Sequence, residues 1–432
     1  MKICVIGTGY VGLVSGSCFS DLGNTVWCVD KDKDKIELLN NNQIPIYEPG
    51  LKELVIKNSS SGRLKFTTNM NLAIKSSDII FICVGTPKSK TNRSADLHSV
   101  FKVASEISNY IKKFKIVVTK STVPVTTGDK IEKIILKKVK RKMFEVLSNP
   151  EFLREGEAIR DFRFPDRIVI GSNNKSATRK LQTLYDPLIK KGAKFFSTSR
   201  RGAEIIKYAS NAFLATKISY INEIANLCEK TGVNVEEVSI GIGLDERIGS
   251  RFLRAGPAYG GSCFPKDTKA ITVTGDLFKT DLSIIKSVIK SNEKRKKILT
   301  ERIVKILSKK IKNKKITFLG VTFKPNTDDM RESSSLMMIP FLLKNGAKVN
   351  YYDPSGKKDE FSKHKNLLFC DDINKACNNA DLIIIHTEWE EFKALDFKKL
   401  NKKKIFKIYD MRNLYSSDLM KKKGLIYHSI GR

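Results

Sequence analysis

The sequence has 432 residues, of which 41% are hydrophobic, and it carries a formal net charge of +33. This length exceeds what one hydrophobic core usually serves, so we expect two or three domains and exclude a mostly disordered chain. The longest apolar runs, such as 79–84 and 382–385, are strand-sized and far shorter than the roughly 20 residues that span a bilayer. The first residues reach a glycine at Gly7 without the apolar stretch of a secretion signal, so we expect a soluble, cytoplasmic protein with no membrane partner.

The eight cysteines are scattered without a Cys-x-x-Cys pair, a distribution typical of reduced thiols rather than of a disulfide framework. None of the four histidines stands in a metal-ligand spacing, so we expect no metal site. The basic charge leaves open a nucleic-acid-binding protein, because such a surface attracts phosphates. However, the lysines occur along the whole chain without the interleaved aromatic residues of a single-strand-binding groove, which favours a solvated, lysine-rich surface and no nucleic-acid partner.

The first third of the chain alternates between strand and helix patterns. Residues 2–6 predict a strand, 11–22 a helix, and 25–29 a second strand that ends at Asp30. Further buried strands are expected at 79–84 and 115–119. Such alternation predicts a parallel, doubly wound sheet, whose ligands bind at the carboxyl ends of the strands.

The same pattern returns near the C-terminus, with strands expected at 315–319, 348–352, 382–385 and 405–409. Between the two repeats, apolar residues recur at helical spacing. We therefore predict an α/β protein of two Rossmann-like doubly wound domains joined by a central helical segment with a long helix. The expected domains are 1–200 for the dinucleotide, 201–307 for the helical centre, and 308–432 for a second nucleotide fold.

A glycine-rich turn, Gly7-Thr8-Gly9-Tyr10-Val11-Gly12, lies between the first predicted strand and helix. This pattern lets the backbone approach a pyrophosphate at a helix N-terminus. Asp30 follows at the end of the second strand, where a carboxylate can accept hydrogen bonds from both ribose hydroxyls. The turn therefore predicts a dinucleotide site, and the acidic residue favours NAD over NADP, although Lys31 and Lys33 lie close by.

A second informative segment is Tyr259-Gly260-Gly261-Ser262-Cys263-Phe264-Pro265-Lys266-Asp267. Pro265 suits the first position of a helix that begins there, which places Cys263 near a helix N-terminus and beside Lys266. Both features favour the nucleophilic thiolate. Asp267 follows one helical turn after Cys263, where its carboxylate can order a water or a proton donor. The alternative is a cysteine that only packs in a glycine turn.

Several long motifs together resemble the UDP-glucose/GDP-mannose dehydrogenase family. They are the N-terminal turn, 149–156 (Asn-Pro-Glu-Phe-Leu-Arg-Glu-Gly), 204–223, 260–267, 323–325 (Phe-Lys-Pro) and 331–333 (Arg-Glu-Ser). They occur in order from Met1 to at least Arg412. One departure is Ala258, where the family pattern leads us to expect glycine or a bulkier residue beside the sugar pocket.

The resemblance implies an NAD-dependent four-electron oxidation of a nucleotide sugar, in which Cys263 holds the substrate as a thiohemiacetal and then as a thioester that water hydrolyses. It implies that Lys207 and Asn211 stabilise the oxyanion, and that Thr122, Glu151 and Asp267 handle the water and the protons.

The resemblance also assigns residues to the two ligands. Those expected to bind NAD are Gly7, Gly9, Tyr10, Val11, Gly12, Asp30, Lys35, Thr86, Ser121, Thr122, Glu155, Lys266 and Arg331. Those expected to bind the nucleotide sugar are Glu151, Phe152, Leu153, Arg154, Glu155, Lys207, Asn211, Arg247, Tyr259, Gly260, Lys324 and Arg412. In the family, the residue at the position of Arg247 enters the neighbouring subunit's site, which implies a homodimer or a higher homo-oligomer.

Three alternatives stay open. The overall likeness favours UDP-glucose as the substrate, but GDP-mannose or an N-acetylated UDP-sugar fits the same catalytic motif. A two-electron hydroxy-acid dehydrogenase of similar build would share the glycine turn and would not need Cys263. Lys207 and Glu151 are also compatible with ordinary solvated positions on helix faces.

Overall fold

The computed structural model describes residues 1–87, 89 and 95–432. The chain forms two compact units: unit 1 is Met1–Ser210 with Val273–Thr280, and unit 2 is Asn211–Thr272 with Asp281–Arg432. The division falls within the long helix α9, Arg200–Thr231, and again within α11, Phe264–Leu277. The expected three-part division at 200 and 307 stays a prediction.

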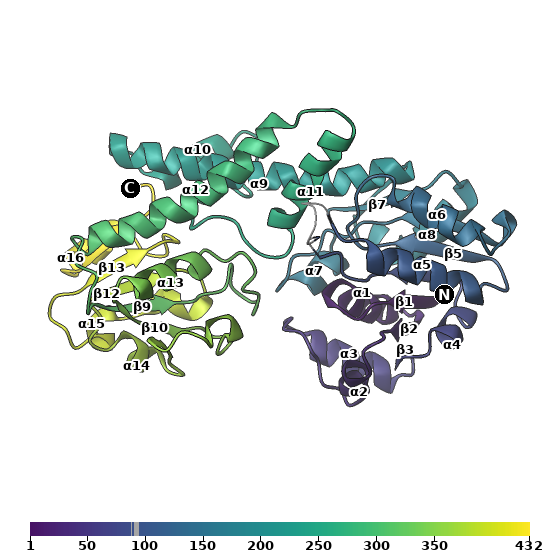
Figure 1. The fold of residues 1–432 in the computed structure, drawn as a ribbon, viewed down its shortest axis with the longest axis horizontal. Coiled ribbons are helices and arrows are strands. Elements are labelled where there is room, and N and C mark those ends of the chain that lie inside the picture. The colour runs from purple at the N-terminus through teal and green to yellow at the C-terminus, as the bar shows by residue number, and fades with distance from the viewer. Residues whose placement is uncertain (88, 90–94) are drawn as a thin grey trace. The chain divides into compact units, whose positions relative to one another are not determined.

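Unit 1 is built on an eight-stranded sheet in the order β3-β2-β1-β4-β5-β6-β7-β8 (Figure 1). All neighbouring strands run parallel except β6 and β7. The strands are β1 Lys2–Ile6, β2 Thr25–Val29, β3 Leu64–Thr67, β4 Ile79–Ile82, β5 Lys115–Thr119, β6 Phe144–Ser148, β7 Arg167–Gly171 and β8 Lys194–Thr198. The helices are α1 Tyr10–Asp21, α2 Lys33–Asn40, α3 Leu51–Ser60, α4 Met70–Lys75, α5 His98–Tyr110, α6 Thr127–Leu136, α7 Ala158–Arg163 and α8 Lys175–Ile189.

Three predicted strands of unit 1 have the predicted bounds, whereas the one expected at 79–84 ends two residues early, at Ile82. The Ile82 carbonyl accepts from the backbone N–H groups of Lys120 and Ser121, at 3.0 Å each, and this ends the ladder with β5. Cys83 and Val84 continue the apolar pattern but belong to the turn that follows. The prediction was wrong there because hydrophobicity alone does not distinguish the end of a strand from a buried turn.

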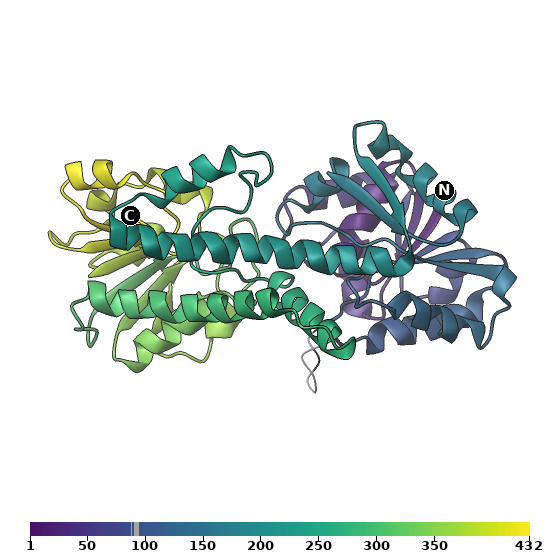
Figure 2. The same cartoon turned by 90° about the horizontal axis from the view of Figure 1, so that it is seen from above.

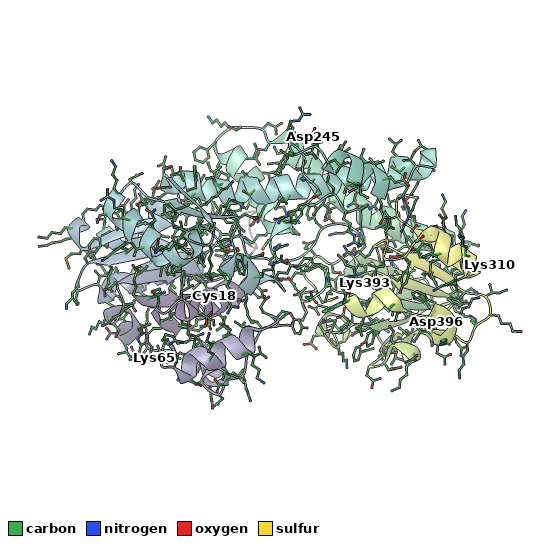
Figure 3. All side chains as sticks on the ribbon, turned by 180° about the vertical axis from the view of Figure 1, so that it is seen from behind. Cys18, Lys65, Asp245, Lys310, Lys393 and Asp396 are labelled. Atoms are coloured by element: carbon green, nitrogen blue, oxygen red, sulfur yellow. The ribbon has the colours of Figure 1, made fainter. Side chains whose placement is uncertain are left out.

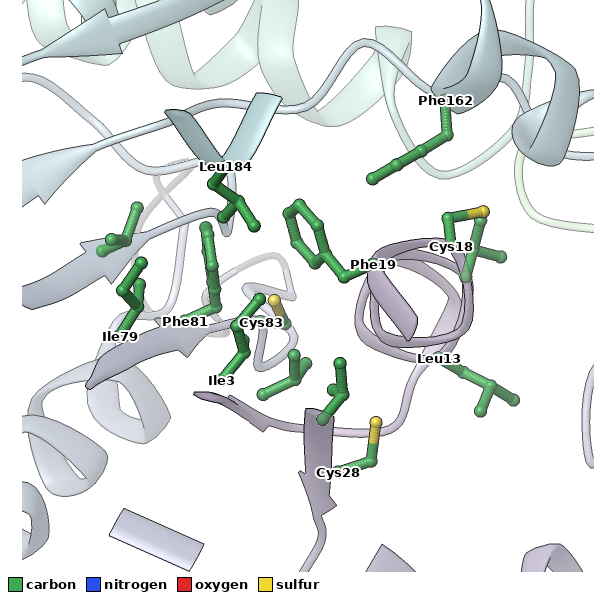
Figure 4. Packing of buried hydrophobic residues seen from close by; sticks show 14 of the residues in the cluster. Ile3, Leu13, Cys18, Phe19, Cys28, Ile79, Phe81, Cys83, Phe162 and Leu184 are labelled. Carbon is green, nitrogen blue, oxygen red and sulfur yellow. The ribbon is translucent and has the colours of Figure 1, made fainter. Parts of the chain in front are cut away.

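One face of the sheet in unit 1 is covered by a core centred on Phe19 of α1. Figure 4 shows the Phe19 ring directed toward Phe81 of β4, with Phe162 of α7 on the other side. The ring centroids of Phe19 and Phe81 are 5.0 Å apart and stacked, and those of Phe19 and Phe162 are 5.1 Å apart, edge to face. Helix α1 therefore packs against both the sheet and α7, which fixes the dinucleotide turn that precedes it.

The centre of the chain is helical, as predicted, with α9 continuous over 32 residues. Figure 2 shows α9 as one uninterrupted helix. It is followed by α10 Val235–Gly243, α11 and α12 Ser283–Ile306. In unit 2, α9 and α12 share a buried cluster that includes Ile221, Ala225, Leu299 and Ile303.

Unit 2 contains a six-stranded parallel sheet in the order β11-β10-β9-β12-β13-β14. Its strands are β9 Lys315–Leu319, β10 Lys348–Tyr352, β11 Leu367–Phe369, β12 Leu382–Ile385, β13 Lys407–Asp410 and β14 Ile426–Ser429. Its remaining helices are α13 Ser335–Lys344, α14 Ile373–Cys377, α15 Phe397–Leu400 and α16 Ser417–Lys422. The α/β class with two Rossmann-like sheets and a long central helix is confirmed.

The strand predicted at 405–409 begins two residues later, at Lys407. Ile405 is 77% exposed, and the ladder with β12 starts by pairing Leu382 with Lys407. The apolar residues Ile405 and Phe406 therefore extended the predicted strand beyond its hydrogen-bonded part.

Most of the excess positive charge is carried by exposed lysines. Figure 3 shows Lys65, Lys310 and Lys393 projecting from the ribbon, with acidic residues such as Asp396 also at the surface. No helix among the described residues is both long enough and apolar enough to span a membrane.

Candidate active site

The dinucleotide turn between β1 and α1 is shaped by its three glycines. Gly7 has φ +99°, and a Cβ at Gly12 would lie 1.8 Å from the Gly7 carbonyl oxygen, so neither position accepts a side chain. A Cβ at Gly9, in contrast, would meet nothing within 4 Å. The backbone at Gly9 therefore opens onto free space at the start of α1, which fits the pyrophosphate of a dinucleotide.

Asp30 lies at the end of β2, one strand away from the turn. Its Oδ2 accepts from both the backbone N–H and the hydroxyl of Thr8, at 2.8 Å each, and lies 3.6 Å from the Lys35 Nζ. Burial by itself raises the pKa of Asp30, but the hydrogen bonds from Thr8 and Asp32 outweigh it and hold the pKa below its ordinary value. The carboxylate is thus ionised and suited to ribose hydroxyls, and it disfavours a 2′-phosphate.

Three further predicted cofactor residues follow β4 and β5. The Thr86 hydroxyl donates to the Thr122 carbonyl at 3.0 Å, and the Ser121 hydroxyl donates to the Val84 carbonyl at 2.7 Å. These bonds tie the two strand ends to each other. The residues therefore lie at the same carboxyl edge of the sheet as Gly7 and Asp30, as expected for parallel strands.

The loop after β6 brings Glu151 to Lys207 of α9. Their side chains are only 5% and 4% exposed, and Lys207 Nζ lies 3.3 Å from Glu151 Oε1. The Glu151 carboxylate also accepts from the Leu153 N–H at 2.6 Å. The solvated positions considered for these two residues are therefore wrong: they form a buried ion pair.

The Phe152 ring lies near two cations. The Arg167 guanidinium lies 3.8 Å and the Lys207 ammonium 5.2 Å from the Phe152 ring centroid. Arg154, from the same loop, instead forms hydrogen bonds to Asp161, at 2.6 Å for the shortest, and an ion pair with Glu157. Arg167 was not predicted, and its place within a strand pattern gave no signal.

Cys263 directly precedes α11. Its carbonyl accepts from the Asp267 N–H at 2.8 Å, so Cys263 occupies the capping position of the helix, and its predicted place near a helix N-terminus is confirmed. The helix begins at Phe264, one residue before the predicted start at Pro265. Of the eight cysteines, all within the described residues, Cys263 is the one that is not buried. Burial raises the pKa of Cys18, Cys83 and Cys377 to about 12, so those thiols stay protonated and inert.

Asp267 is 1% exposed and has two partners in unit 2. Its Oδ2 accepts from the Asn211 amide at 2.7 Å, and its Oδ1 lies 2.6 Å from the Lys266 ammonium. Lys266, which we expected to act on the Cys263 thiolate, therefore has Asp267 as an ion-pair partner. The pairing of Asn211 with Asp267 was not predicted, because 56 residues separate them.

The segment before Cys263 packs closely on the loop that follows β9. A Cβ at Gly260 would lie 2.8 Å from the Glu332 carbonyl oxygen, and one at Gly261 would lie 2.6 Å from the Phe323 ring. Ala258 has φ +96°, which explains why glycine is expected there. The side-chain amide of Asn292 holds the Tyr259 backbone: its oxygen accepts from the Tyr259 N–H at 2.9 Å, and its nitrogen donates to the Tyr259 carbonyl at 3.1 Å.

Four predicted ligand residues from the later part of the chain are spread over unit 2. Arg331 pairs with Asp329, and Arg247, 89% exposed, pairs with Asp245. The Lys324 ammonium lies 5.8 Å from the Phe323 ring. Arg412 donates to the carbonyls of His386 and Phe323, at 2.8 and 2.9 Å, and pairs with Glu388 at 2.7 Å.

Sequence reasoning also missed the residues that support the Cys263 segment from α9 and α12. The Asn222 side chain accepts from the Gly256 N–H at 2.9 Å, and Arg295 donates to the Gly256 carbonyl at 3.2 Å. Asn292 and Arg295 lie on the buried face of α12, between Val288 and Leu299. Polar residues on an apolar helix face were the available signal.

Models of one family match almost the whole chain in three consecutive parts. The parts are the NAD binding domain over residues 1–189, the central domain over 201–294, and the UDP binding domain over 317–417. The chain belongs to the UDP-glucose/GDP-mannose dehydrogenase family. The resemblance drawn from the motifs is confirmed, and so are the dehydrogenase class and NAD as its cofactor.

Individual proteins similar to this chain carry names that belong to the same family. A UDP-glucose 6-dehydrogenase of Rhizobium meliloti is 49% identical over 435 residues, covering 100% of both chains. The solved UDP-glucose dehydrogenase of Pyrobaculum islandicum is 35% identical, with a TM-score of 0.90 over 99% of this chain and 96% of that one. A UDP-D-ManNAc dehydrogenase of Pyrococcus horikoshii is 26% identical, with a TM-score of 0.87 over 100% and 99%. The fold is thus shared by enzymes for different sugars.

Proposed function

We propose that this chain oxidises UDP-glucose to UDP-glucuronate, consuming two NAD and one water, with Cys263 as the covalent catalyst. The observation that carries the proposal is that Cys263, at the start of α11 and one turn from the buried Asp267, is not buried, unlike the other seven cysteines. Its relatives named UDP-glucose 6-dehydrogenase, at 49% and 45% identity over the full chain, favour this sugar.

When bound, NAD supplies the acceptor for the hydride removed from C6 in each of the two oxidations. The Cys263 sulfur adds to the C6 aldehyde carbon, which forms a thiohemiacetal and keeps the intermediate on the protein. After the second oxidation the same carbon is a thioester, and attack by water breaks the C–S bond, releasing the carboxylate and the thiol. A thiol suits this sequence because a thioester is far more reactive toward water than an ester.

We assign the groups that transfer protons to two buried clusters, one around Lys207 and Glu151 and the other around Asp267. Lys207, held by Glu151, supplies a positive charge that stabilises an oxyanion, and Glu151 is the carboxylate that accepts protons from the alcohol or the water. Asp267, held by Asn211 and Lys266, orients the water or its proton near Cys263. Thr122 and Asn211 assist as hydrogen-bonding groups.

The remaining ligand residues are proposed by correspondence with the family. Asp30 with Lys35 would hold the adenosine ribose of NAD, and Gly9 would face its pyrophosphate. The segment 151–155, Tyr259, Gly260, Lys324 and Arg412 would bind the nucleotide sugar.

The test counts NADH formed per sugar. Purified protein with NAD is given limiting UDP-glucose, UDP-N-acetylglucosamine, UDP-N-acetylmannosamine or GDP-mannose in separate reactions. We expect two NADH per UDP-glucose and little turnover of the others. Preference for another sugar would contradict the assignment of UDP-glucose as the substrate. Formation of one NADH per sugar would indicate a two-electron dehydrogenase.

Cys263→Ser tests the covalent step. We expect it to lose the second oxidation or nearly all turnover, while the control Cys228→Ala, a buried cysteine of α9, keeps two NADH per sugar. Normal stoichiometry and rate in Cys263→Ser would contradict the covalent mechanism.

We propose further that the chain works as a cytoplasmic homodimer or higher homo-oligomer. Phe213, Tyr220 and Leu227 of α9 stand seven residues apart on one helix face and are 65%, 51% and 58% exposed. A stripe of this kind on a single helix is suited to a second copy of the chain. The eight free cysteines fit a reducing compartment.

A further inference from the structure

Glu48 is a buried carboxylate outside all the sites described above. It lies between α2 and α3 and is only 8% exposed. Although the chain has 79 lysines and arginines, none among the described residues forms an ion pair with it. Its partners are instead backbone N–H groups and one phenol. Burying a carboxylate without a cation costs free energy. We therefore infer that Glu48 is placed there because of the groups to which it hydrogen-bonds.

The carboxylate joins three segments of unit 1. Glu48 Oε2 accepts from the Tyr10 hydroxyl and, at 2.6 Å, from the Gly156 N–H. Glu48 Oε1 accepts from the Ala158 N–H at 2.8 Å. The Tyr10 hydroxyl in turn accepts from the Gly156 N–H at 2.7 Å. These bonds link the 41–50 segment, the first residue of α1 and the start of α7.

Both ends of this link lead to a ligand site. Tyr10 follows Gly9, whose backbone opens onto the space that fits the pyrophosphate. Gly156, with φ +80°, ends the loop that carries the buried Glu151 and Phe152, whose ring lies near two cations. A shift of α1 at Tyr10 is therefore transmitted through Glu48 to the loop, and a shift of the loop is transmitted back.

We propose that Glu48 is a positioning residue that couples cofactor binding at the glycine turn to nucleotide-sugar binding on the 151–155 loop. The inference rests on the proposed function for the identity of the sugar. In this arrangement the Glu48 carboxylate caps α7, and its hydrogen bond to the Tyr10 hydroxyl makes its position depend on that of α1. Each bound ligand therefore orders the segment to which the other ligand binds. The two ligands therefore bind more tightly together than separately.

The rival explanation is that Glu48 only caps α7 and stabilises the fold. The two explanations differ in what Tyr10→Phe does. This variant removes one hydroxyl and leaves the Glu48 bonds to Gly156 and Ala158 in place, so a cap alone would be preserved. Glu48→Gln weakens both the cap and the link.

The experiment measures the dissociation constant of NADH with and without saturating UDP-glucose, a pair that does not turn over. For the native protein we expect UDP-glucose to tighten NADH binding by about fivefold or more. For Tyr10→Phe and Glu48→Gln we expect this factor to fall toward one, with Tyr10→Phe melting at nearly the native temperature. The control Glu53→Gln, an exposed residue of α3, should keep the native factor.

An unchanged factor in Tyr10→Phe, or no coupling in the native protein, would overturn the inference. Absence of any UDP-glucose binding to the native protein would instead count against the proposed substrate. In that case the same titration with the sugar that turns over tests Glu48 separately.

Discussion

The buried pair of Lys207 and Glu151 allows its effect on stability to be separated from its effect on catalysis. Replacing Lys207 by Met leaves the Glu151 carboxylate, 5% exposed, without its cation. Breaking a buried pair in this way costs about 3–5 kcal/mol. In a domain of about 200 residues this corresponds to a fall in melting temperature of roughly 6–20 °C.

The double variant Lys207→Met with Glu151→Gln removes both charges and keeps an acceptor for the Leu153 N–H. We expect it to recover most of the lost stability but none of the activity, because the cation and the carboxylate are both absent. Thermal unfolding followed by calorimetry, beside NADH formation, measures the two effects on the same samples.

The control is Lys190→Met, which breaks the ion pair with Asp186. That pair is shorter, at 2.7 Å, but its side chains are 76% and 46% exposed, so we expect no measurable change in the melting temperature. If Lys207→Met melts within about 2 °C of the double variant, the stabilising role assigned to the ion pair is refuted. If the double variant turns over UDP-glucose at the native rate, the catalytic role is refuted.

Other expectations concern the cofactor turn, two titrating groups and the helix stripe. Gly9→Ala should fold normally and raise the KM for NAD by about 30-fold or more, because its methyl group blocks a charge-assisted backbone contact. The control Gly241→Ala, whose Cβ also lies in open space, should change neither folding nor this KM. An unaltered KM in Gly9→Ala would argue against pyrophosphate binding at Gly9. Burial, followed by the charge of Arg412, lowers the pKa of His386 to about 3, so its contribution to stability is complete above pH 6.5 and is lost as the pH falls toward 3; acid unfolding of His386→Gln should be less steep than that of the native chain. Burial raises the pKa of Glu204 to about 7 despite hydrogen bonds from Gly128 and Thr126, so the native chain should lose stability as pH rises from 4.5 to 7, and a slope equal to that of Glu204→Gln would contradict this. Phe213→Asp with Leu227→Asp should give a smaller species in sedimentation, while an unchanged mass would place the interface elsewhere.

The local sequence was enough to predict most of the sheet framework. Strands at 2–6, 25–29, 315–319 and 348–352 have the predicted bounds, because a short apolar run that ends at glycine or aspartate leaves few other conformations. The strand at 115–119, which ends at Lys120, also has the predicted bounds. The errors at Val84 and Ile405 arose where apolar residues continue beyond the hydrogen-bonded ladder. The glycine turn and the helix start at Cys263 were equally local, since both depend on residues within one turn of each other.

The partners of the buried charged groups were not predictable in the same way. Lys207 meets Glu151, Asn211 meets Asp267, and Glu48 meets Gly156 across 56 to 108 residues of intervening chain. Which residues meet at such separations depends on how the helices pack across the sheet. The periodicity of side chains along one helix or strand does not predict that packing. The sequence by itself thus determined the two nucleotide folds, the glycine turn and the position of Cys263 at a helix start. Only the tertiary structure decided which carboxylates are buried against which cations, because desolvation and pairing exist only once distant segments have packed together.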